Sequence, residues 1–478
     1  MDAAAYLEHD GLGLAGLLER GEASPVELMR CAIGLARQRA PALNLLCHEA
    51  DEAALAQASA ATPRGTFGAL PFLLKDSGLP ARALPSGIGS RLFGDLEFKF
   101  DATLLQRFEQ CGFIPFARTT VPELCMAPTT EALRNGGPTR NPWDPSRSAG
   151  GSSGGAAAAV AVGIVPIAHA NDGGGSIRIP ASCCGVYGLK PSRGLVPMGP
   201  ARGEGWGGLA AEGVVSRSVR DTAAVLDAVA GYESGAPYAA PAQPASYLRL
   251  LDEPFARPLR ILKWTTGFDG IPVDPECRMA VDNAARLLAS AGHEVIDAAP
   301  PDIGFAAFID AHTDVMAANI VVTVDALAAG ADDAARRAGL ENAIYDGYGI
   351  GRTLEAARYA RAINTFHAVG RRLARHMEGH DLVLTPTLAQ PPAKLGEIST
   401  ATDFRSFRRA VSRYATFLSI INASGQPAAS VPLHWNSAGL PIGVQLIGAF
   451  GDDATVLRVS AQLESLKPWK DRRPPLRS

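Results

Sequence analysis

Short apolar runs alternate with amphipathic stretches along most of the chain. The apolar runs that we expect to form buried strands are residues 71–74, 113–117, 259–262, 293–296, 382–384 and 442–447. The stretches that we expect to be helical are residues 24–40, 101–112, 156–162, 218–230, 274–291 and 353–378. This alternation of helices and strands predicts an α/β layered fold.

Two long stretches lack Asp, Glu, Lys and Arg altogether: residues 148–171 and residues 414–451. Pro166 interrupts the first, and three prolines interrupt the second, so neither has the roughly 20 unbroken apolar residues of a membrane span. We interpret both as buried core. The Pro-, Gly- and Ala-rich residues 235–245 are the best candidate for a linker.

Composition and charge argue against several classes of function. The chain has 478 residues, 47% of them hydrophobic, and a net charge of −3, which gives no electrostatic reason to bind nucleic acid or an anionic membrane. Its seven cysteines are scattered without a C-x-x-C pair, so we expect no disulfide framework, metal or other cofactor. The cysteine pattern favours a reducing, cytoplasmic location, and the N-terminus is acidic where a signal peptide is basic. Length alone predicts about three domains.

Two glycine-rich loops are candidates for chemistry. In the second, Asp172-Gly-Gly-Gly-Ser176, successive N–H groups can converge on one negative charge. Ser176 would then be a nucleophile and the N–H groups of Gly173, Gly174, Gly175 and Ser176 an oxyanion hole. A tight turn between two strands explains the same residues.

A serine nucleophile needs a base. His169 is the nearest histidine in sequence, but we interpret it as a core residue. Lys75 ends an apolar strand, where burial would favour its neutral form, although an ion pair with Asp76 remains an alternative.

The first loop, Gly150-Gly-Ser-Ser-Gly-Gly155, also fits the G-x-S-x-G pattern of a nucleophile elbow. That motif requires a preceding strand, whereas residues 141–147 contain two prolines and several turn formers. We therefore place Ser152 in a proton relay rather than at the point of attack.

Together these segments resemble the amidase signature family. The matching motifs are Lys75 in Leu-Pro-Phe-Leu-Leu-Lys-Asp, the block 150–155, Asp172-Gly-Gly-Gly-Ser-Ile-Arg-Ile-Pro180, Gly188-Leu-Lys-Pro191, Thr385-Pro-Thr387 and Gly439-Leu-Pro-Ile-Gly-Val-Gln445. The two serines, Ser152 and Ser176, lie 24 residues apart, as in that family. The similarity is weak between residues 235 and 381. Many members carry threonine where this chain has Asn171.

The resemblance implies roles and a fold. Lys75 would be a neutral base, Ser152 a proton shuttle on a cis peptide bond, and Ser176 the attacking residue, with Ser153, Asp172 and Arg178 as supporting residues. The family fold is a mixed central sheet with helices on both faces in one domain, here residues 1–478, which replaces the estimate of three. Residues 235–381 would form a more variable, substrate-specific portion. A homodimer is a further expectation.

The implied function is hydrolysis of a small, largely apolar amide, linear or cyclic, through an acyl-enzyme. The stretch from Asp172 to Gly185 looks like the branch that contains 6-aminohexanoate cyclic-dimer hydrolases. Open alternatives are a carbamate or aryl-amide hydrolase, the glutamine amidase subunit of a tRNA-dependent amidotransferase, and an inert binding protein on the same scaffold.

Overall fold

One mixed β-sheet of 11 strands runs through the protein, in the order β1-β3-β2-β4-β6-β5-β10-β11-β9-β7-β8. The computed structural model describes residues 1–239 and 241–475, so residue 240 of the expected linker lies outside the described residues. The strands are β1 Leu46–Glu49, β2 Leu70–Lys75, β3 Phe113–Thr119, β4 Ile167–Asp172, β5 Tyr187–Lys190, β6 Ala211–Ser216, β7 Arg260–Lys263, β8 Glu294–Asp297, β9 Leu382–Pro386, β10 Ala428–Trp435 and β11 Pro441–Gly448.

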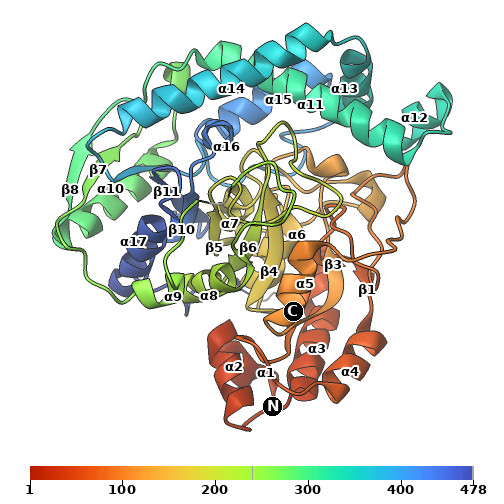
Figure 1. Ribbon diagram of the computed structural model, residues 1–478, viewed down its shortest axis with the longest axis vertical. Helices are drawn as coiled ribbons and strands as arrows, with labels where there is room; N and C mark the ends of the chain where they lie inside the picture. Colours follow the sequence, from red (N-terminus) through yellow and green to blue (C-terminus); the bar gives the residue numbers. More distant parts are fainter. Residues whose placement is uncertain (240, 476–478) are drawn as a thin grey trace.

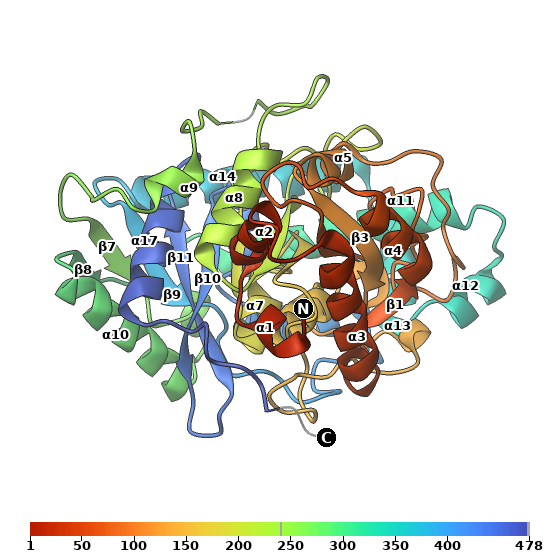
Figure 2. The same ribbon diagram turned by 90° about the horizontal axis from the view of Figure 1, so that it is seen from below.

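Helices cover both faces of this sheet, as the family resemblance implied. The α-helices are α1 Ala3–Leu7, α2 Gly11–Glu19, α3 Pro25–Leu43, α4 Asp51–Ala60, α5 Thr103–Gln110, α6 Gly154–Ala161, α7 Arg178–Cys184, α8 Val219–Val229, α9 Tyr247–Leu250, α10 Pro275–Ser290, α11 Phe305–Leu327, α12 Asp333–Gly339, α13 Asn342–Arg352, α14 Ala356–His376, α15 Phe404–Tyr414, α16 Ser419–Ser424 and α17 Asp453–Leu466. Helices α8 and α17 lie on one side of the sheet, and α7 and α10 lie on the other (Figure 2). Helices α11, α13, α14 and α15 pack on one another in a layer along one end of the strands, at the top of Figure 1.

Local sequence explains several of these elements. Helix α3 begins with a capping box, in which the Ser24 hydroxyl accepts from the Glu27 N–H and the Glu27 carboxylate accepts from the Ser24 N–H. Every residue of α6 is buried, and its alanines allow it to lie close to the strands of the sheet. The charge-free residues 148–171 are therefore core, as predicted.

Strand β10 was not predicted, because Pro432 interrupts its apolar run. The structure places this proline where the register of β10 against β11 shifts, between Val431 and His434. A proline is tolerated at such a bulge because the ladder needs no N–H donor there. The sequence alone does not show where a bulge falls.

Helix α11 is the one helix of the described residues that is long and apolar enough to cross a membrane. Its most apolar window is 56% buried inside the protein, and the helix packs against α13 and α14. It therefore behaves as a core helix of the fold.

Candidate active site

Lys75 ends β2, a central strand with parallel neighbours β3 and β4 on its two sides. All six residues of β2 are buried, and the lysine side chain itself is 0% exposed. Parallel strands buried on both faces are continuous apolar runs, which is why Phe72-Leu73-Leu74 precedes the lysine. The strand thus carries an amine into the interior, as its sequence predicted.

Three oxygen atoms surround the Lys75 amine. Nζ lies 2.6 Å from the side-chain Oδ1 of Asn171, 3.4 Å from the main-chain carbonyl oxygen of Asn171, and 2.7 Å from Oγ of Ser152. A neutral amine has two N–H donors and one lone pair. The two Asn171 oxygens can accept only hydrogens, so they take the donors, and the lone pair is left for the Ser152 hydroxyl.

Burial lowers the pKa of Lys75, and the negative charges of nearby Glu212 and Asp172 oppose that shift in part. The alternative of an ion pair with Asp76 is wrong. The Asp76 carboxylate turns away and accepts hydrogen bonds from Ser86 Oγ at 2.5 Å and from the Gly87 N–H at 3.0 Å. No carboxylate of the described residues lies within ion-pair distance of the amine, which favours the neutral form.

Ser152 lies in the loop before α6 and follows a cis peptide bond, Gly151–Ser152. No strand leads into this loop, so the strand–turn–helix geometry of a nucleophile elbow is absent from it. The neighbouring Ser153 joins the two glycine-rich loops: its N–H donates to the Ser176 carbonyl at 3.3 Å, and its hydroxyl donates to the Asn171 carbonyl at 3.3 Å.

Ser176 lies at the end of the second glycine-rich loop, just before α7, and is 8% exposed. The structure brings Ser152 close to Lys75, but no hydrogen bond among the described residues joins the hydroxyls of Ser152 and Ser176. The N–H groups of Gly173, Gly174 and Ser176 have no acceptor among the described residues. The expectation for Gly175 needs correction, because its N–H donates to Asp172 Oδ1 at 2.6 Å.

Asp172 and Arg178 form a fully buried pair beneath this loop. Arg178 donates to the carboxylate through Nε and Nη2, both at 2.9 Å, and the two side chains are 0% exposed. The alternative of a surface pair is therefore wrong. Burial alone would raise the pKa of Asp172, but the Arg178 charge and the hydrogen bonds from Arg178 and Asn422 together outweigh it and hold that pKa well below its ordinary value. The ionised carboxylate also accepts from the Ile177 N–H at 3.1 Å, so it shapes the loop.

His169 is a core residue, as interpreted. Its Nδ1 accepts from the Lys75 N–H at 3.2 Å, and its Nε2 lies 2.9 Å from Oε2 of Glu212. Burial lowers its pKa, so the ring is neutral. Its hydrogen bonds go to Lys75 and Glu212, and none among the described residues joins it to Ser176.

A cavity opens beside Ser176 and encloses about 650 Å³ of space, open solvent included. Its wall combines apolar and polar side chains, and the apolar ones include Ile88, Leu124, Met126 and Trp206. Polar groups at the wall include Asn171, Glu212, Arg202, Thr323 and Cys125. The Trp206 ring covers Gly173, so closely that a Cβ built there would lie 2.4 Å from it.

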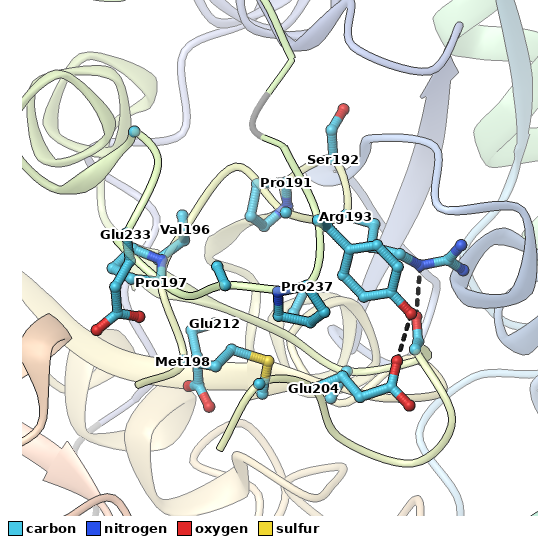
Figure 3. A pocket seen from close by; sticks show the side chains of 18 residues that line it. Pro191, Ser192, Arg193, Val196, Pro197, Met198, Glu204, Glu212, Glu233 and Pro237 are labelled. Carbon is cyan, nitrogen blue, oxygen red and sulfur yellow. Dashed lines mark hydrogen bonds between the residues drawn. The ribbon is translucent and has the colours of Figure 1, made fainter. Parts of the chain in front are cut away.

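A second cavity, of about 500 Å³, shares Met198, Ala210 and Glu212 with the first (Figure 3). Its one arginine, Arg193, is occupied by main-chain carbonyls, including those of Gly208 and Asn422. Among the described residues that line this cavity there is no other Lys, Arg or His, so they offer a ligand no cationic group that is not already hydrogen-bonded.

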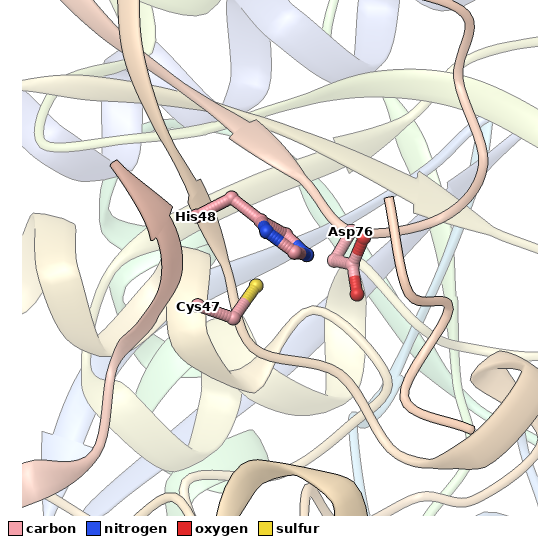
Figure 4. A group of neighbouring side chains, drawn as sticks. All are labelled: Cys47, His48 and Asp76. Carbon is pink, nitrogen blue, oxygen red and sulfur yellow. The ribbon is translucent and has the colours of Figure 1, made fainter. Parts of the chain in front are cut away.

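One group of described side chains is spaced for a metal ion: Cys47, His48 and Asp76, whose ligand atoms lie within 4.8 Å of one another (Figure 4). The Asp76 carboxylate is already held by Ser86 and Gly87, and the buried Arg118 guanidinium lies near it. A further cation beside that guanidinium would be repelled, so we assign no metal to this group.

Sequence reasoning missed Asn171, Glu212 and Trp206 as parts of the site. Asn171 carried a signal, since threonine is common at its position in the family. Glu212 and Trp206 carried none, because only the pairing of β4 with β6 and the path of residues 198–211 bring them to the loop.

A buried amine on a serine hydroxyl, and a second serine beneath free N–H donors, are typical of a serine hydrolase. The amidase family model matches residues 27–457. The chain is 34% identical to the 6-aminohexanoate-cyclic-dimer hydrolase of Paenarthrobacter ureafaciens, over 98% of this chain and 97% of that protein. A structure of 6-aminohexanoate cyclic dimer hydrolase with substrate superposes with a TM-score of 0.92 at 33% identity, covering 98% and 99% of the two chains. A bacterial aryl acylamidase superposes with a TM-score of 0.87 at 27% identity, with 96% of each chain covered.

The chain therefore belongs to the amidase family, and it is a hydrolase that acts on amides.

Proposed function

We propose that this protein hydrolyses small, largely apolar amides, linear or cyclic, through an acyl-enzyme on Ser176. The observation that carries the proposal is the 2.7 Å contact between the Lys75 amine and the Ser152 hydroxyl, in a place where the amine is buried and its other two contacts accept hydrogens.

In the first half-reaction, Ser152 gives its proton to the Lys75 lone pair and takes the proton of Ser176. The Ser176 oxygen attacks the amide carbon, and the N–H groups of Gly173, Gly174 and Ser176 bind the oxyanion. The C–N bond then breaks, the relay returns a proton to the departing nitrogen, and the amine leaves.

In the second half-reaction, water replaces the amine. The relay takes a proton from water as its oxygen attacks the acyl carbon. The bond to Ser176 breaks, the Ser176 oxygen regains a proton, and the carboxylic acid leaves. Ser153 supports both steps by joining the loop around Ser152 to the loop around Ser176. The Asp172–Arg178 pair supports them by fixing the shape of the second loop.

The apolar side chains of the cavity wall support a substrate with a largely apolar part, and the relatives support cyclic or aromatic amides. Helix α11 contributes Thr323 to the wall, which fits a specificity role for residues 235–381. An aryl amide is the second candidate, because Trp206 at the wall offers an aromatic face and one similar structure is an aryl acylamidase. A cytoplasmic location and a homodimer remain predictions.

The test is hydrolysis by the purified protein of a substrate panel: the cyclic dimer of 6-aminohexanoate, aliphatic amides, anilides, carbamates and glutamine. We expect the highest kcat/KM on an apolar cyclic or aliphatic amide, and less than about one-thousandth of it in Ser176→Ala, since the nucleophile is lost. Activity on glutamine alone would contradict the substrate class, and an active Ser176→Ala would contradict the mechanism.

A further inference from the structure

Glu212 is a buried carboxylate close to the Lys75 amine that the relay described above does not use. It lies on β6, opposite Asn171 of β4 in an antiparallel pair, and is 2% exposed. No Lys or Arg of the described residues lies within ion-pair distance of it; its one such partner is the ring of His169. A buried carboxylate without a cationic partner is costly, so its position needs a reason.

Each oxygen of this carboxylate holds a residue that contacts Lys75. Oε1 accepts from Nδ2 of Asn171 at 3.4 Å, and Oδ1 of the same amide accepts from the Lys75 amine at 2.6 Å. Oε2 lies 2.9 Å from Nε2 of His169, whose Nδ1 accepts the Lys75 main-chain N–H at 3.2 Å. Because Nδ1 is an acceptor, Nε2 carries the proton and donates it to Glu212.

These contacts orient both ends of Lys75. A carboxylate accepts only, so it forces the Asn171 amide to present its NH₂ to Glu212 and its oxygen to the lysine. That oxygen takes one amine hydrogen and turns the lone pair toward Ser152. The main-chain end of Lys75 is held in turn by His169, in the tautomer that Glu212 selects.

Glu212 also acts on Lys75 through its charge, because the other groups near the amine are neutral or already paired. The thiol of Cys125 stays protonated because burial raises its pKa, and Asp172 is neutralised by Arg178. His169 is neutral, Asp76 faces Ser86, and the Arg118 guanidinium donates to the Lys75 carbonyl at 3.1 Å.

Glu212 itself stays ionised. Burial would raise its pKa, but the hydrogen bond from His169 and the nearby positive charges, that of Arg202 among them, together lower it below its ordinary value. It is therefore the carboxylate near Lys75 that is free to compensate a charge on the amine.

We propose that Glu212 is a positioning residue for the base: through Asn171 and His169 it aims the Lys75 lone pair at Ser152, and its charge stabilises the ammonium that forms when Ser152 is deprotonated. This inference rests on the proposed function, in which Lys75 is the base. The bond that forms is N–H on Lys75 and the bond that breaks is O–H on Ser152, while Glu212 keeps its charge throughout.

The test is the pH dependence of kcat/KM in Glu212→Gln. Activity falls on the acid side as Lys75 becomes protonated. Removing a nearby negative charge makes the lysine release its proton more easily, so the acid limb should move to lower pH by about one unit. The plateau should fall about tenfold, because the ammonium loses its counter-charge.

Asn171→Asp gives the opposite shift. It has the same shape, but it places a carboxylate directly on the amine, so the acid limb should move to higher pH by about one to three units. A residue that only maintains the fold would lower activity at every pH without moving the limb. Opposite shifts in the two variants are therefore specific to the proposed role.

Glu464→Gln is the matched control. This carboxylate on α17 is also partly buried and accepts the Val219 N–H at 3.0 Å, but it lies at a cavity near the chain termini. We expect the limb of this variant at its wild-type position. If Glu212→Gln does not fold, Glu212→Ala removes the same charge, and Glu212→Asp, which keeps it, should hold the limb near the wild-type pH.

Two outcomes distinguish a failure of the proposed function, in which Lys75 is the base, from a failure of the role proposed for Glu212. If Lys75→Met is as active as wild type, the proposed function is wrong. If Lys75→Met is inactive while a folded Glu212→Gln or Glu212→Ala has an unshifted acid limb, the base assignment stands and the role of Glu212 is wrong.

Discussion

Replacing Asp172 with asparagine removes one charge from the pair beneath the catalytic loop and keeps the shape of the side chain. The carboxylate accepts from Arg178 twice, from Gly175 and Ile177 of the loop, and from Asn422 Nδ2 at 2.9 Å. Asparagine has one oxygen for these donors, so some of them lose their acceptor. The Arg178 guanidinium stays buried without a counter-charge.

Breaking a buried pair by removing one partner typically costs about 3–5 kcal/mol, because the other charge is left uncompensated. We expect Asp172→Asn to lower the free energy of unfolding by about that amount, measured by urea denaturation with tryptophan fluorescence. Activity should fall at least about a hundredfold, since a misplaced loop displaces the oxyanion donors.

The effect should also depend on pH. Arg178 holds the pKa of Asp172 below its unfolded value, so the carboxylate contributes its full stabilisation above the unfolded pKa and loses it as pH falls. The difference between wild type and variant should be constant above about pH 5 and shrink below about pH 4. Arg257→Ala, which breaks an exposed pair with Asp381, should leave the midpoint almost unchanged. An Asp172→Asn midpoint equal to that of Arg257→Ala would refute the reasoning.

Two further predictions follow from packing. Gly173→Ala should lower kcat/KM at least about tenfold with little change in the unfolding midpoint, because a Cβ there would meet the Trp206 ring at 2.4 Å and displace a wall of the cavity; unchanged steady-state kinetics would contradict this. Phe72→Ala should lower the free energy of unfolding by about 3–5 kcal/mol, because the loss of this fully buried ring leaves a cavity. The ring stacks on that of Phe113, with 4.3 Å between the ring centroids. The control is Phe100→Ala, at a side chain that is 42% exposed, and equal midpoints for the two variants would contradict the account.

Local chemistry made much of the fold predictable. The capping box at Ser24, the apolar run before Lys75 and the periodic helices α8, α10 and α14 each follow from neighbouring residues, and each is present. Strands β1, β4, β5, β6 and β10 were missed. They are short or interrupted by glycine and proline, and they form because long-range partners complete their ladders.

In the candidate site, too, some features could be predicted from local sequence and others could not. Lys75, Ser152 and Ser176 stand in motifs whose spacing is visible in the sequence. The depth of the Asp172–Arg178 pair, the use of the Gly175 N–H and the contact of Glu212 with Asn171 depend on how β4 and β6 pair and on what covers them. Burial and hydrogen-bond partners of this kind are set by tertiary packing, so periodicity does not report them.

The relay from Lys75 through Ser152 is tested most directly by the rate at which a fluorophosphonate probe labels Ser176. The account predicts labelling at Ser176, with a rate that rises as pH increases through the pKa of Lys75, which burial holds below its ordinary value. In a folded Lys75→Met variant, labelling should be about 10²–10⁴-fold slower. Wild-type labelling rates in Lys75→Met, or a label on Ser152 instead, would contradict the account.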